Sequence, residues 1–228
     1  MCKIGEVVVV GGVRRSAMIS LSNLSDDRMR HAKSGQWWEK NGQRALANNS
    51  VAYTEKPDME TFIREWLSLV ESKSGERGIF SRPASKQQAL KNGRRNADFD
   101  FGTNPCSEII LRPYQFCNLT EVVVRATDTL EDLERKVRLA TILGTIQSTF
   151  THFPYLRKVW KDNTEEERLL GVSLTGILDN PMLTNNDMAI SCEGWSVAKI
   201  LEHLKNVAIT TNAEWAEHLG IPASAAIT

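Results

Sequence analysis

Four residues in one short stretch of the chain could carry out redox and proton-transfer chemistry: Asn104, Cys106, Glu108 and Cys117. The first three stand at alternate positions, and in an extended segment the side chains at i, i+2 and i+4 point to the same side. We therefore expect an amide, a thiol and a carboxylate to share one face. A second thiol at Cys117, close behind, could form a disulfide or pass on electrons.

The short pattern by itself leaves alternatives open. A buried strand with a hydrogen-bonded asparagine and an inert cysteine would present the same three residue types. A simple thiol–disulfide protein is another alternative, although the chain contains no Cys-x-x-Cys. The four histidines are scattered and none stands at a zinc-like spacing, so we expect no metal site formed by protein ligands.

The composition is that of an ordinary globular protein. Lys plus Arg and Asp plus Glu each number 28, so the net charge is zero and favours neither nucleic acid nor an anionic membrane as a partner. No apolar run approaches the roughly 20 residues of a membrane helix, and no signal peptide is visible. Four cysteines in 228 residues are too few for a disulfide scaffold, which predicts a cytoplasmic protein.

The elements that must position the motif alternate between strands and helices. Runs rich in β-branched residues predict strands at 7–10, 17–21, 50–53, 169–177 and 221–228. Helical spacing and capping residues predict helices over 57–71, 84–91, 130–150 and 194–219. This alternation predicts an α/β protein with parallel strand pairing. Because the chain starts and ends on strands, we expect it to be part of a larger barrel or sheet.

Two of these helices carry apolar stripes at helical spacing; we expect the second stripe to be buried and Trp66 of the first to lie in the core or at an interface. The stripes comprise Phe62, Trp66 and Val70 in the first helix and Leu130, Leu133, Val137 and Leu143 in the second.

The segment from Asn104 to Leu111, with Tyr114, Cys117-Asn118-Leu119 and Glu121 after it, resembles the active-site finger loop of class II ribonucleotide reductases. It is most like the monomeric ribonucleoside-triphosphate reductases that depend on adenosylcobalamin. Three other blocks resemble the family in the same order: a specificity loop near 11–17, a strand at 48–52 and a barrel strand at 170–176. The resemblance implies part of a ten-stranded α/β barrel, with a finger loop near 102–118.

The resemblance also implies a role for each motif residue. Cys106 matches the cysteine that becomes a thiyl radical and takes the 3′-hydrogen of the substrate. Glu108 matches the carboxylate that accepts the proton of the 3′-hydroxyl, and Asn104 matches the amide that hydrogen-bonds substrate hydroxyls. Cys117 matches one member of the cysteine pair that reduces C2′ and ends as a disulfide. In the specificity loop the matching residues are Gly11, Gly12, Val13, Arg14, Arg15 and Ser16.

By the same resemblance, the cofactor is adenosylcobalamin and the reaction is the reduction of ribonucleoside triphosphates to deoxyribonucleoside triphosphates for DNA synthesis. Expected partners are a deoxynucleoside triphosphate effector and a thioredoxin-type reductant, and the full-length enzyme is expected to be an allosteric monomer. The alternative within the enzyme class is the large subunit of a class I ribonucleoside-diphosphate reductase.

The chain also departs from the family pattern. The partner of Cys117 is expected upstream of the specificity loop; Cys2 lies too close to that loop, and Cys192 is expected to be structural. We therefore expect residues 1–228 to be a partial catalytic barrel domain that lacks N-terminal and C-terminal parts. Such a piece is expected to be inactive unless the missing segments complement it.

Overall fold

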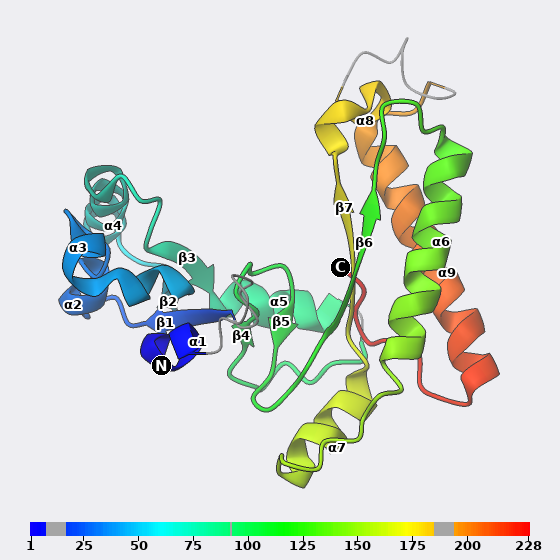
Figure 1. Ribbon diagram of the computed structural model, residues 1–228, viewed down its shortest axis with the longest axis horizontal. Coiled ribbons are helices and arrows are strands. Elements are labelled where there is room, and N and C mark those ends of the chain that lie inside the picture. Colours follow the sequence, from blue (N-terminus) through cyan, green and yellow to red (C-terminus); the bar gives the residue numbers. More distant parts are fainter. Residues whose placement is uncertain (8–16, 92, 185–193) are drawn as a thin grey trace. The chain divides into compact units, whose positions relative to one another are not determined.

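The computed structural model describes residues 1–7, 17–91, 93–184 and 194–228. These residues form two compact units, one from Met1 to Pro113 and the other from Tyr114 to Thr228. Both units mix helices with parallel strands, as the sequence predicts (Figure 1). No described helix is both long enough and apolar enough to cross a membrane.

The first unit is built on a parallel sheet with the strand order β1–β2–β3. The strands are β1 (Met18–Ser22), β2 (Ala47–Tyr53) and β3 (Gly78–Ser81). The central strand β2 is buried at six of its seven residues, as expected for a parallel strand covered on both faces. Around the sheet lie α1 (Cys2–Val7), α2 (Asp27–Arg30), α3 (Trp37–Asn41), η1 (Gly42–Leu46), α4 (Met59–Ser72) and α5 (Arg82–Lys91).

The N-terminal strand prediction is wrong for the residues that the structure describes there. Residues Cys2–Val7 form the helix α1, whereas Val8, Val9 and Val10 lie outside the described residues. Val7 has a high β propensity, which is a weak preference that its context overrides here. The proposed specificity-loop residues Gly11, Gly12, Val13, Arg14, Arg15 and Ser16 also lie outside the described residues.

Helix α4 forms where the sequence predicts a helix, but its apolar stripe does not face the core. Trp66 is 56% exposed and Val70 is 63% exposed, while Phe62 stacks on Trp66 at the surface. The side that faces inward carries Glu65 and Ser68 instead. The helix begins at the N-cap Asp58, whose carboxylate accepts a hydrogen bond from the backbone N–H of Thr61.

A buried ionic cluster explains the inward side of α4. Glu65 accepts two hydrogen bonds from Arg77, Nε–Oε2 at 3.0 Å and Nη2–Oε1 at 2.8 Å, and a third from Arg30 Nε at 2.6 Å. Arg77 also donates to the carbonyls of Asn23 and Leu24, just after β1. Burial alone would raise the pKa of Glu65, but the hydrogen bonds from Arg77 and Arg30 outweigh it and lower that pKa.

The second unit pairs β6 (Asn118–Val123) with β7 (Leu170–Thr175) in parallel. Residue Ile227 forms a parallel bridge to Leu170, which agrees with the strand predicted at the end of the chain. The helices α6 (Leu130–Gln147) and α9 (Val197–Leu219) lie side by side along these strands (Figure 1). The remaining elements are α7 (Lys158–Glu167), η2 (Ile177–Asp179) and α8 (Pro181–Thr184).

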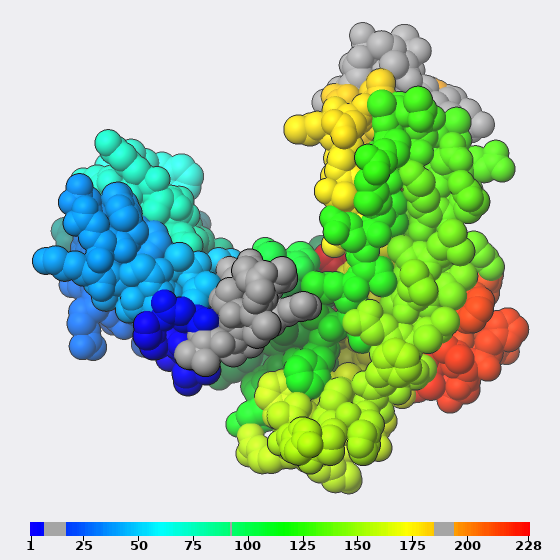
Figure 2. Space-filling view, viewed as in Figure 1, coloured from blue at the N-terminus to red at the C-terminus, as the bar shows by residue number. Residues whose placement is uncertain are grey.

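The predicted stripe of α6 is buried in its first half only. Leu133 and Val137 are in the core, whereas Leu143 is 63% exposed. In the second half the buried positions are small, among them Gly144, where an added Cβ would lie 3.5 Å from Leu170. Small side chains on the inner side let the helix approach the strands closely. The outer side of α6 is exposed and forms part of the surface of this unit (Figure 2).

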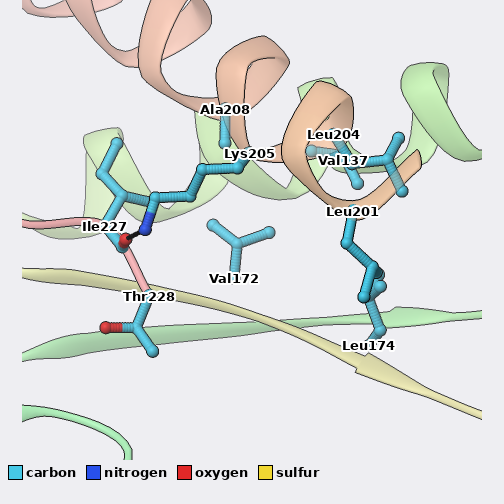
Figure 3. A pocket seen from close by; sticks show the side chains of 9 residues that line it. All are labelled: Val137, Val172, Leu174, Leu201, Leu204, Lys205, Ala208, Ile227 and Thr228. Atoms are coloured by element: carbon cyan, nitrogen blue, oxygen red, sulfur yellow. Dashed lines mark hydrogen bonds between the residues drawn. The ribbon is translucent and has the colours of Figure 1, made fainter. Parts of the chain in front are cut away.

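An apolar cavity of about 160 Å³ lies between α6, α9 and β7, with Val172 and Leu204 among its lining residues (Figure 3). Lys205 extends along it and donates a hydrogen bond from Nζ to the carbonyl of Ile227. Burial lowers the pKa of Lys205, because the apolar surroundings disfavour its charged form.

Candidate active site

The motif predicted to carry the chemistry lies in a hairpin of the first unit. Strand β4 (Gly102–Thr103) pairs antiparallel with β5 (Ile110–Leu111), and residues 104–109 connect them. Thr103 closes the connection, because its Oγ1 donates to the carbonyl of Ile109 at 3.0 Å. The backbone N–H of Asn104 donates to the same carbonyl at 3.4 Å. The hairpin therefore holds both ends of the motif.

The motif itself is a turn, so the prediction that it is extended with one shared face is wrong. The N–H of Ser107 donates to the carbonyl of Asn104 at 3.0 Å, which closes a four-residue turn. Pro105 occupies the second position, where its fixed φ angle favours a turn. Ser107 has a φ of 67°, in the left-handed region that follows such a turn. Alternation of side chains does not apply to this geometry.

Asn104 is buried and uses its side chain to shape the hairpin. Its Oδ1 accepts a hydrogen bond from the N–H of Ile109 at 3.1 Å. Because a backbone N–H can only donate, this contact identifies the oxygen of the amide. The Nδ2 group is then the part of Asn104 that can donate to a ligand.

Cys106 and Glu108 differ in their surroundings. The side chain of Cys106 is exposed at the turn, so its thiol is accessible. Glu108 is partly buried, and its Oε2 is a buried oxygen without a hydrogen-bond partner among the described residues. A buried oxygen that lacks a partner costs free energy, about 1–3 kcal/mol or more for a charged group. Such an oxygen is suited to a hydroxyl group supplied by a bound molecule.

Cys117 belongs to the second unit, where it directly precedes β6 and is partly buried. The next residue, Asn118, donates from its backbone N–H to the carbonyl of Leu169 at 2.9 Å. The preceding residue, Phe116, packs against Phe153 and Trp160 with ring centroids 5.1 and 4.8 Å away. The backbone around this cysteine is therefore fixed on both sides.

Helix α7 contributes residues to this segment that the sequence pattern did not identify. Gln115 is buried and donates from Nε2 to Oε2 of Glu167 at 2.5 Å, while Asn163 donates to the carbonyl of Tyr114 at 3.2 Å. The pairs are separated by 52 and 49 residues, so no local spacing could have indicated them.

The described residues contain no group of three His, Cys, Asp or Glu side chains that could hold a metal ion. The described part of the first unit offers an accessible thiol, an amide donor and a carboxylate oxygen with no partner in that part of the chain.

No family model matches the chain. It is 36% identical over 180 residues to the adenosylcobalamin-dependent ribonucleoside-triphosphate reductase of Lacticaseibacillus paracasei, and the match covers 77% of this chain and 23% of the relative. It is 34% identical over 181 residues to the protein of the same name from Lactobacillus helveticus, with the same coverage. Its structure matches the crystal structure of a B-12-dependent (class II) ribonucleotide reductase with a TM-score of 0.65 and 25% sequence identity, over 99% of this chain and 33% of that one.

The fold and the sequence are those of a segment of the class II ribonucleotide reductases. Within this class, the chain is a homologue of the adenosylcobalamin-dependent ribonucleoside-triphosphate reductases. The resemblance found in the sequence motifs is thereby confirmed. The chain spans 23% of the length of the curated relatives that it matches.

Proposed function

We propose that this chain supplies the finger loop of an enzyme that reduces ribonucleoside triphosphates to 2′-deoxyribonucleoside triphosphates. The observation that carries the proposal is the hairpin of the first unit, where an exposed thiol at Cys106 stands two residues from a carboxylate oxygen of Glu108 that has no hydrogen-bond partner among the described residues. The names of the relatives support the same reaction and do not favour the class I diphosphate reductase.

In the proposed reaction, Cys106 as a thiyl radical takes the hydrogen atom from C3′ of the ribose and becomes a thiol. Glu108 accepts the proton of the 3′-hydroxyl, which is general base chemistry for which an oxygen without a partner is available. The Nδ2 group of Asn104 donates to a substrate hydroxyl while its Oδ1 remains bonded to Ile109.

The 2′-hydroxyl then leaves as water, and the ribose gains two electrons. A dithiol supplies these two electrons together with two protons, one for the leaving hydroxyl and one for C2′, and becomes a disulfide. Glu108 then returns its proton to the 3′-oxygen, and Cys106 returns the hydrogen atom to C3′ and is again a thiyl radical. We propose Cys117 as one of the two thiols. The resemblance is also the basis of five further proposals: a second thiol, a deoxynucleotide effector, a thioredoxin-type reductant, a monomeric state and a cytoplasmic location.

The relatives are named for adenosylcobalamin, whose chemistry when bound is to supply a radical. The exposed position of Cys106 fits a thiol that is oxidised by a group bound outside its own hairpin. The roles proposed for this chain are those of its own side chains.

The test places this chain in the matching segment of the Lacticaseibacillus paracasei reductase and compares single substitutions in an active chimera. Cys106→Ser should lower deoxynucleotide formation by at least ~10³-fold, because the radical carrier is lost. The same substitution at Cys2 is the matched control and should leave turnover unchanged. Retained nucleotide reduction in Cys106→Ser would refute the proposed site. The class I alternative is tested outside the chimera, in the full-length protein that contains this chain: nucleotide reduction there should depend on added adenosylcobalamin, and activity without it would favour class I.

A further inference from the structure

A second asparagine lies at the hairpin that carries the proposed radical cysteine. Asn48 stands in β2, and its Nδ2 donates a hydrogen bond to the carbonyl of Pro105. The residues 48 and 105 are far apart in sequence, so this contact connects the sheet to the turn. Strand β2 is the central strand and is paired on both sides, by β1 and by β3. Asn48 itself pairs with Ile19 of β1, whereas the pairing with β3 begins at Ser50.

The acceptor of this hydrogen bond is directly next to Cys106. The carbonyl of Pro105 belongs to the planar peptide that joins Pro105 to Cys106, so fixing its oxygen fixes the plane of that peptide. The orientation of this plane fixes the direction of the N–Cα bond of Cys106, and so helps to place the Cα from which the thiol side chain projects. The hydrogen bond from Ser107 to Asn104 closes the turn locally, whereas Asn48 ties the turn to the sheet.

The neighbouring residue Asn49 makes a different hydrogen bond. Its side chain points to the opposite face of β2, since successive residues of a strand alternate. Its Nδ2 donates to the carbonyl of Met29 at 2.7 Å, which holds α2 rather than the hairpin. Two adjacent asparagines in one strand thus hold two different parts of the unit.

We propose that Asn48 is a positioning residue for Cys106: it orients the turn so that the thiol faces the substrate. This inference rests on the proposed function, because it assigns to Cys106 the reacting sulfur. It adds a residue to the site that lies 58 positions before Cys106 (106 minus 48) and outside the finger-loop motif. Asn48 acts through the backbone of Pro105 and does not itself touch the substrate.

The experiment compares Asn48→Ser with Asn49→Ser in the active chimera, because both substitutions shorten an asparagine of the same strand. Asn48→Ser should lower kcat by about 10- to 100-fold and leave KM within about twofold, as expected for a misplaced reacting group. Asn49→Ser should change kcat by less than about threefold, although it should lower the melting temperature at least as much as Asn48→Ser does. The isosteric variant Asn48→Asp, which replaces the donor with an oxygen, should resemble Asn48→Ser.

A second measurement uses the chain itself and does not depend on turnover. In Asn48→Asp the NMR resonance of the Pro105 carbonyl carbon should shift, and in Asn49→Ser it should not. Equal losses of kcat in Asn48→Ser and Asn49→Ser would overturn the positioning role. Full activity in both Asn48 variants would also overturn it, provided that Cys106→Ser is inactive. Activity retained in Cys106→Ser refutes the proposed function instead, so the two failures are distinguishable.

Discussion

Replacing the buried carboxylate of Glu65 should destabilise the first unit far more than a surface charge does. In Glu65→Gln the shape is kept, but one negative charge disappears between Arg77, which is 1% exposed, and Arg30. Removing one partner of a buried ion pair typically costs 3–5 kcal/mol, because an uncompensated charge remains. Arg30 is 20% exposed and keeps its ion pair with Asp27, so we expect the lower end, about 3 kcal/mol.

The matched control is Glu60→Gln in the same helix. Glu60 and its partner Arg64 are 74% and 71% exposed, and an exposed pair of this kind contributes less than about 0.5 kcal/mol. Hydrogen exchange of the amides of α4 measures the two variants without interference from the second unit. A loss of about 3 kcal/mol corresponds to roughly a hundredfold faster exchange through global opening.

The pH dependence gives an independent check on the same cluster. The folded-state pKa of Glu65 is lowered, so its stabilisation is fully present above the unfolded value of about 4.3 and is lost as the pH falls through the folded value. The difference between the natural chain and Glu65→Gln should therefore shrink below about pH 4. A loss at neutral pH no larger than that of Glu60→Gln would refute the reasoning.

Three other predictions concern the second unit and are checked by urea unfolding. Gly176→Ala should lower the free energy of unfolding by more than about 2 kcal/mol, because the φ of Gly176 is 74° and an added Cβ would lie 2.5 Å from the carbonyl of Val124. Gly220→Ala is the control and should lower it less, because a Cβ added there meets no atom within 4 Å. Thr129→Ala removes the capping box of α6 and should cost about 1 kcal/mol. The pKa of Lys205 is lowered, so stability should rise with pH just below the unfolded value of about 10.4, and Lys205→Met should abolish the rise.

The sequence was sufficient to predict the class of fold because that class depends on local patterns. Alternating strands and helices with parallel pairing are present in both units, and the helices expected over 57–71 and 194–219 correspond to α4 and α9. Capping residues placed the starts of α4 and α6 well, since Asp58 and Thr129 both accept hydrogen bonds from the first turn.

The burial of α4 could not be predicted in the same way. Helical spacing states which residues share a face, but it does not state which face is covered. Here the inward face is chosen by Glu65, whose partners Arg30 and Arg77 lie 35 and 12 residues away in the sequence. The position of Asn48 next to the turn is unpredictable for the same reason, because its partner Pro105 is 57 residues away.

The turn at the motif changes how the candidate site is understood. An extended strand would have aligned an amide, a thiol and a carboxylate by alternation alone, and no other contact would have been needed. In the turn, their arrangement depends on hydrogen bonds: Oδ1 of Asn104 holds the N–H of Ile109, and Asn48 holds the carbonyl of Pro105. The oxygen of Asn104 is therefore structural while its nitrogen remains available as a donor. One amide thus shapes the loop and can also bind the substrate, so its two atoms have separate tasks in the proposed reaction.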